Sequence, residues 1–161
     1  SGYVPLGATA VNQRVAMAWE KDHSLAPIMH GYTYSGHPVA CAAAIANLKI
    51  VEDENLASNA AKVGNYFLEK LIEIKAKHAS IGDVRGRGLM LGIEFVKNRK
   101  TKEPFAPNDP YLQSIGPHCR KRGVLVRTQG HRIIISPPLT FTKENVDEAI
   151  DVLDSAFAGT K

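Results

Sequence analysis

Apolar positions recur at spacings of three and four in two stretches of the chain, and this period predicts two amphipathic helices. The first is expected to begin after Asn55 and to end near Lys77, with basic residues in its last turn and Gly82 just beyond it. Its apolar stripe consists of Leu56, Ala60, Val63, Phe67, Leu71 and Ile74. The second is expected to follow Thr142, whose side chain can cap a helix. Its apolar stripe consists of Val146, Ala149, Ile150, Leu153 and Phe157.

Between these two helices, apolar residues recur at a period of two. Residues 84–97 ("VRGRGLMLGIEFVK") alternate apolar and polar positions, which predicts one strand with a buried face. A polar loop (97–109) and a helix (110–122) closed by Gly123 are expected next. The runs "VLVRT" (124–128) and "RIIIS" (132–136) predict a hairpin across "QGH".

The first part of the chain has a different character. Turn and strand residues (1–10), a short helix (11–22) and a loop (23–37) are expected before Pro38, which opens an alanine-rich helix at a position where its missing N–H costs nothing. The resulting fold class is α/β. We divide the chain into the end of a larger domain (1–37), connecting helices (38–83) and a small α+β domain (84–161).

Composition narrows the function classes. The chain has 161 residues, of which 44% are hydrophobic and 22% charged, as in ordinary soluble globular proteins. The net charge is +4, and the basic residues are scattered along the chain. The densest basic cluster, residues 97–102, is expected to be a solvated loop, so the sequence does not favour nucleic-acid binding. Cys41 and Cys119 have no zinc or disulfide spacing, and Cys41 is expected to be a small buried hydrophobe, which suits a reducing cytoplasm. No apolar run approaches the roughly 20 residues of a membrane span.

One stretch, "HGYTYSGHPVACAAAI" (30–45), suggests an anion site. The hydroxyls of Thr33 and Ser35, two glycines and the helix start at Pro38 are the groups that hold anions at helix N-termini. The alternative is that Ser35 caps the helix and the glycines only turn the chain.

Arginines provide further candidates. Arg127 places a cation on an apolar β run, where its planar fork suits a carboxylate, although it can also face solvent from an edge strand. Arg85 and Arg87 are each expected to take part in a fixed ion pair. The six histidines show no paired ligand spacing, so no metal site is predicted.

Four stretches together resemble the class III aminotransferases. "SGYVPLGA", "HGYTYSGHPVACAAA", "VRGRGLMLGIEF" and "ISPPLTFTKENVDEAIDVL" stand in the order and at the spacing seen in that family. The resemblance implies a fold-type I enzyme that uses pyridoxal 5'-phosphate. The "YTYSGHP" form is similar to the branch that moves an amino group from ω-amino acids or amines to pyruvate.

The resemblance also implies roles for three residues. Thr33 matches the family's phosphate-binding threonine, which acts across the dimer interface, and Tyr32 matches the aromatic residue beside it. Arg127 matches the arginine that binds the substrate carboxylate and moves aside for an uncharged amine. The lysine that forms the Schiff base is implied to lie a few residues upstream of Ser1. The chain is therefore expected to be the C-terminal part of such an enzyme and to be inactive alone.

Partners and alternatives follow from the same resemblance. The implied partners are a small amine or amino acid, a keto acid, the missing N-terminal portion and a second copy in a homodimer or larger assembly, with neither nucleic acid nor membrane. A fold-type I decarboxylase or aminomutase remains an alternative. So does a lysine-free binding module without turnover.

Overall fold

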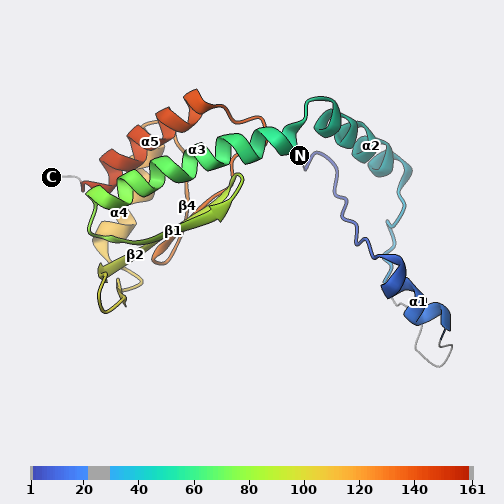
Figure 1. Ribbon diagram of the computed structural model, residues 1–161, viewed down its shortest axis with the longest axis horizontal. Helices are drawn as coiled ribbons and strands as arrows, with labels where there is room; N and C mark the ends of the chain where they lie inside the picture. The colour runs from blue at the N-terminus through green and yellow to red at the C-terminus, as the bar shows by residue number, and fades with distance from the viewer. Residues whose placement is uncertain (1, 22–29, 160–161) are drawn as a thin grey trace. The chain divides into compact units, whose positions relative to one another are not determined.

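The computed structural model describes residues 2–21 and 30–159, which fall into two compact units, Ser1–Glu54 and Asn55–Lys161 (Figure 1). The first unit contains helices α1 (Gln13–Lys21) and α2 (Pro38–Asp53). Pro38 occupies the first turn of α2, as predicted, because its fixed φ suits a helix start. The predicted domain limits at residues 37 and 83 concern a longer protein and stay a prediction.

The second unit is built on an antiparallel sheet. Its strands are β1 (Ile81–Arg87), β2 (Met90–Asn98), β3 (Glu103–Pro104), β4 (Arg127–Gln129) and β5 (Arg132–Ile135). The main path runs β1-β2-β5-β4, and β3 pairs with β2. The predicted hairpin of the last two strands is confirmed, with Arg127 opposite Ile134 and Gln129 opposite Arg132.

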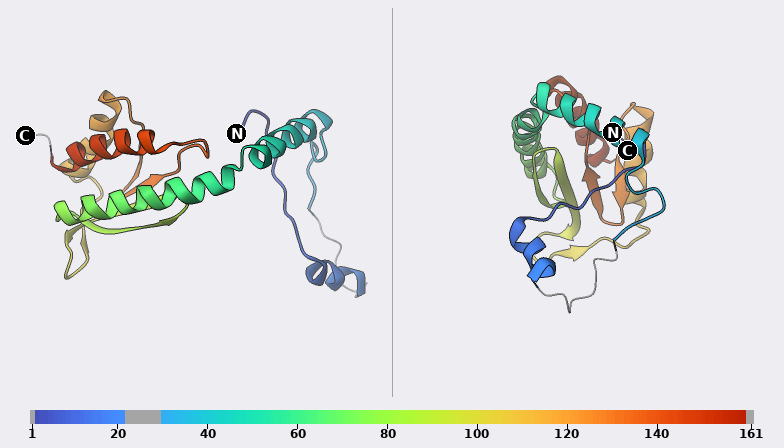
Figure 2. Two further views of the ribbon diagram at one scale, coloured as in Figure 1. Left: turned by 45° about the horizontal axis from the view of Figure 1, so that its top comes forward. Right: turned by 90° about the vertical axis from the view of Figure 1, so that its right-hand side faces the viewer.

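Three helices cover one face of this sheet (Figure 2). They are α3 (Leu56–Lys77), α4 (Pro110–Lys121) and α5 (Lys143–Phe157). All six predicted apolar residues of α3 are buried, and α5 buries its stripe except for the half-buried Ile150. Thr142 caps α5 in a reciprocal capping box with Asn145, which confirms the predicted helix start.

The predicted single strand over 84–97 is wrong, because this stretch contains most of a β-hairpin. β1 and β2 pair from Ile81 opposite Phe95 to Arg87 opposite Met90. Gly88 adopts a positive φ of 54° between the strands, a conformation that favours glycine. Leu89 lies in the turn and is buried, so the alternation of apolar residues continues through a change of direction.

Side-chain positions refine two local predictions. Residues 97–102 are exposed, as predicted, but the Arg99 guanidinium also donates to the carbonyls of Ile81 (2.8 Å), His78 (2.5 Å) and Lys75, and so satisfies groups at the end of α3 and the start of β1. Cys41 is half-buried rather than buried.

Among the described helices, none combines the length and the apolar character needed to cross a membrane.

Candidate functional site

The turn before α2 exposes the predicted phosphate-binding residues. Tyr32 N–H donates to Ser35 Oγ (2.9 Å), Ser35 N–H donates back to the Tyr32 carbonyl (2.9 Å), and Gly36 adopts a φ of 69°. Tyr32 and Thr33 are both exposed on this turn. The Ser35 hydroxyl is therefore used within the turn, and the interpretation of Ser35 as the helix cap is wrong. His37 holds the N-cap position, without a side-chain cap hydrogen bond.

The uncapped start of α2 leaves hydrogen-bond donors available. Pro38 has no N–H, and the N–H groups of Val39 and Ala40 precede the first intrahelical bond, from Cys41 N–H to the His37 carbonyl (2.9 Å). Within residues 2–21 and 30–159, the Thr33 hydroxyl has no hydrogen-bond partner. A hydroxyl and free backbone N–H groups near a helix N-terminus are donors of the kind that a phosphate group requires.

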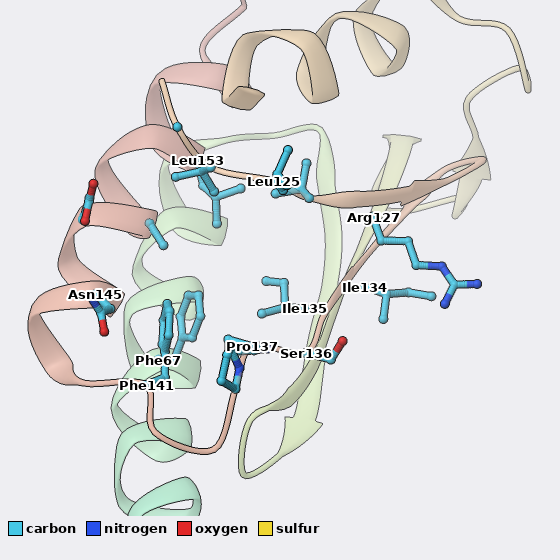
Figure 3. A pocket seen from close by; sticks show the side chains of 16 residues that line it. Phe67, Leu125, Arg127, Ile134, Ile135, Ser136, Pro137, Phe141, Asn145 and Leu153 are labelled. Carbon is cyan, nitrogen blue, oxygen red and sulfur yellow. The ribbon is translucent and has the colours of Figure 1, made fainter. Parts of the chain in front are cut away.

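Arg127 opens β4 on the side of the sheet that the helices do not cover. Because side chains alternate along a strand, the burial of Ile133 and Ile135 under the helices places Ile134 and its cross-strand partner Arg127 on the opposite face. Figure 3 shows the Arg127 side chain directed away from Phe67 and Phe141. In the described part of the chain, no carboxylate pairs with this exposed guanidinium.

Arg85 differs from Arg127, because it is held by two carboxylates. Its Nη1 lies 2.6 Å from Asp83 Oδ2 and 2.9 Å from Glu94 Oε2, which confirms the ion pair predicted for this residue. These hydrogen bonds lower the pKa of both carboxyl groups below their usual values. No such pair is found for Arg87 among the described residues.

A cavity of about 450 Å³ lies between α3, α5 and the segment that connects β5 to α5 (Figure 3). Its walls are mostly apolar and include Phe67, Phe141, Leu125 and Ile135. Arg127 also contributes atoms to its rim. This cavity could not be predicted from the sequence, because its walls come from segments that are distant in sequence and have the composition of ordinary core.

The predicted site residues lie in both units. Tyr32 and Thr33 are neighbours in the first unit, whereas Arg127 belongs to the second. The described residues contain no cluster of three or more His, Cys, Asp or Glu side chains that could hold a metal ion.

Comparisons with known proteins agree on one family. The sequence model for aminotransferase class-III matches residues 1–157. A probable γ-aminobutyrate transaminase 3, mitochondrial, from Oryza sativa subsp. indica is 38% identical over 100% of this chain and 32% of its own length. An amine transaminase from an uncultivated Pseudomonas species is 48% identical, with a TM-score of 0.89 over 98% of this chain and 36% of that protein. An (S)-enantioselective ω-transaminase from Thermomicrobium roseum gives 39% identity and a TM-score of 0.85, over 98% and 34%.

The chain therefore belongs to the class III aminotransferases, which are pyridoxal-phosphate-dependent enzymes. The predicted family and fold class are confirmed. The chain spans about a third of the length of these relatives.

Proposed function

We propose that this chain is the C-terminal part of an aminotransferase that moves an amino group from an ω-amino acid or amine to pyruvate. The observation that carries the proposal is an exposed, unpaired Arg127 on the helix-free side of the sheet in a class III chain. The names of the relatives, which include γ-aminobutyrate, amine and ω-transaminases, support a donor whose amino group is not on the α-carbon of a standard amino acid.

The turn before α2 supplies the proposed phosphate site. Thr33 would donate its hydroxyl to the cofactor phosphate bound mainly by a second subunit, and Tyr32 would line the same site. The uncapped N-terminus of α2 adds backbone N–H groups and the positive end of the helix dipole. Pyridoxal phosphate, when bound, supplies the electron sink that transamination requires. The residues of this chain would position it and the substrate.

Arg127 would bind the substrate carboxylate. A guanidinium forms two parallel hydrogen bonds with a carboxylate, and its long stem allows it to turn away when the substrate has no acid group. Its place at the beginning of a three-residue strand, without an ion pair in the described residues, leaves it free to do both. One site could then accept pyruvate in one half-reaction and an uncharged amine in the other.

The test compares the two half-reactions in the complete enzyme. Arg127→Ala should slow the half-reaction with pyruvate much more than that with an uncharged amine, by a loss of about 2–5 kcal/mol in transition-state stabilisation for the acid. Arg127→Lys should recover charge but not the planar fork, and therefore only part of this rate. Arg120→Ala, which removes an exposed arginine from α4, is the matched control. Equal losses in single-turnover rates with both substrates would assign Arg127 a structural role.

A further inference from the structure

The cavity between α3, α5 and the segment that connects β5 to α5 has the dimensions of a small-molecule site (Figure 3). Its volume of about 450 Å³ falls within the range of roughly 300–1,000 Å³ that such sites occupy. Phe67 and Phe141 form one wall, with ring centroids 6.3 Å apart and ring planes at 17°. Leu153 and Ile135 also line the space and are both buried. These side chains suit a compact apolar group, and we call the space that they line the aromatic cavity.

A carboxylate lies at the edge of the aromatic cavity. Glu148 lines the cavity from α5 and is exposed, and it has no ion pair within the described residues. The amide oxygen of Asn145, which also lines the cavity, already accepts hydrogen bonds from the N–H and the hydroxyl of Thr142 (both 3.2 Å). Glu148 therefore provides the anionic group that a ligand in this cavity would meet.

The net charge of α5 has the same sign as Glu148. The helix contains a single basic residue, Lys143, and its acidic residues are Glu144, Asp147, Glu148, Asp151 and Asp154. A surface with an excess of one sign of charge attracts ligands of the opposite sign. The helix therefore favours a cation in the cavity over an anion.

The guanidinium of Arg127 does not reverse this preference. Among the described residues that line the cavity, Arg127 is the only basic one. Its side chain is directed away from Phe67 and Phe141, toward the side of the sheet that the helices do not cover (Figure 3). Its positive charge therefore lies outside the aromatic cavity.

We propose that the aromatic cavity binds a small organic cation, whose ammonium group pairs with Glu148 and whose apolar group packs against Phe67 and Phe141. Removal of the apolar surfaces from water supplies most of the binding free energy. The ion pair with an exposed carboxylate contributes less, but it selects cations over neutral or anionic molecules of similar shape. The inference concerns binding alone and holds whichever substrates the enzyme uses.

The test uses benzyltrimethylammonium as the probe and the complete enzyme with its cofactor bound. The quaternary nitrogen of the probe carries no hydrogen, so the probe cannot serve as an amino donor. Titration followed by methyl NMR should give saturable shifts at Leu153 and Ile135, with a dissociation constant in the millimolar range or tighter. The methyl groups of Ile72, which is exposed on α3 and does not line the cavity, should not shift.

Variants separate the contribution of charge from that of shape. Glu148→Gln keeps the size of the side chain and should weaken binding of the probe by about three- to fivefold. Asp151→Asn removes a carboxylate of the same helix outside the cavity and should change the affinity by less than about twofold. Ala149→Leu places a larger side chain in the cavity and should weaken binding at least about tenfold. The exposed Glu148 keeps the test decisive if Ala149→Leu disturbs the fold.

Three outcomes would overturn the proposal. The absence of saturable shifts at Leu153 and Ile135 would mean that the cavity takes no organic cation. Equal affinities of Glu148→Gln and the wild type would mean that the carboxylate does not select the ligand. Shifts in the 161-residue chain that disappear in the complete enzyme would identify another part of the protein as the occupant. None of these measurements depends on turnover, so the proposed function stands or falls separately, with the half-reactions of the Arg127 variants.

Discussion

The hydrogen bonding of two hydroxyls distinguishes a phosphate site from a simple helix cap at the turn before α2. Thr33 has no partner in the described residues, whereas Ser35 accepts a hydrogen bond from Tyr32 N–H. Thr33→Ala in the complete enzyme should therefore weaken cofactor binding by roughly 1.5–3 kcal/mol, the value of one hydrogen bond to a charged group. Thr33→Ser keeps the hydroxyl and should restore most of this affinity. Equilibrium titration of the apoenzyme with pyridoxal phosphate gives the measurement, and unchanged affinity in Thr33→Ala would contradict the assignment.

Another residue-scale prediction concerns acid stability. The Asp154 carboxylate lies 2.5 Å from His78 Nε2 and 3.2 Å from Lys77 Nζ, and the hydrogen bond with His78 is the main cause that lowers the pKa of Asp154. A lowered pKa in the folded state contributes stability above the unfolded pKa of about 3.9, and this contribution is lost as the pH falls through the folded pKa. Asp154→Asn should therefore lose less stability than the wild type when the pH falls below about 4.

Urea unfolding at a series of pH values between neutral and acid checks this expectation. Asp151→Asn is the matched control, because Asp151 lies on the exposed side of the same helix. The control should keep the acid dependence of the wild type. If Asp154→Asn and the wild type lose stability in parallel below pH 4, the pair with His78 does not contribute to acid stability.

Helices could be predicted where the residues that define them lie close together in the sequence. The stripe from Leu56 to Ile74, the cap at Thr142 and the start at Pro38 each depend on residues within a few turns of one helix. The β1–β2 hairpin was not predicted, because residues 84–97 keep their alternation through the turn at Gly88. The role of Arg99 was missed for a similar reason, since its acceptors lie 18 to 24 residues earlier in the chain.

The packing of α3 on the turn between β1 and β2 gives an element-scale prediction. A Cβ added to Gly64 would lie 2.1 Å from the backbone carbonyl of Gly88, so the helix and the turn meet without a side chain between them. Gly64→Ala should destabilise the protein by about 1–3 kcal/mol, because the clash exceeds the gain in helix propensity. Gly116→Ala on α4 is the matched control.

The control isolates the clash from the effect of alanine on a helix. An added Cβ at Gly116 would meet only the Thr128 side chain, at 3.7 Å, which is ordinary contact. Gly116→Ala should therefore be neutral or stabilising by up to about 1 kcal/mol. Chemical denaturation of both variants provides the comparison. Equal effects at the two glycines would mean that α3 can move away from the turn at no cost.

The arrangement of the whole molecule was the least predictable from sequence. The division of the chain into compact units after Glu54 follows from the packing of α3 on β1 and α5, which brings together residues that are far apart in the sequence. The side of the sheet on which Arg127 lies could not be read from its apolar neighbours. It follows from the pairing with Ile134 and from the helices that cover Ile133 and Ile135.

The last prediction concerns the chain as a whole. We expect the 161-residue chain alone not to transfer an amino group from an amine to pyruvate. The proposed contributions of Thr33 and Arg127 only bind and position groups, whereas transamination also needs a lysine amine that carries the substrate proton. We propose that this lysine lies in the part of the protein that this chain does not contain. The measurement is alanine formation by the pure chain with pyruvate, an amine and excess pyridoxal phosphate, compared with the free cofactor and with the longer protein. A rate above that of the free cofactor would contradict the expectation and would require that one of the lysines of this chain does the chemistry.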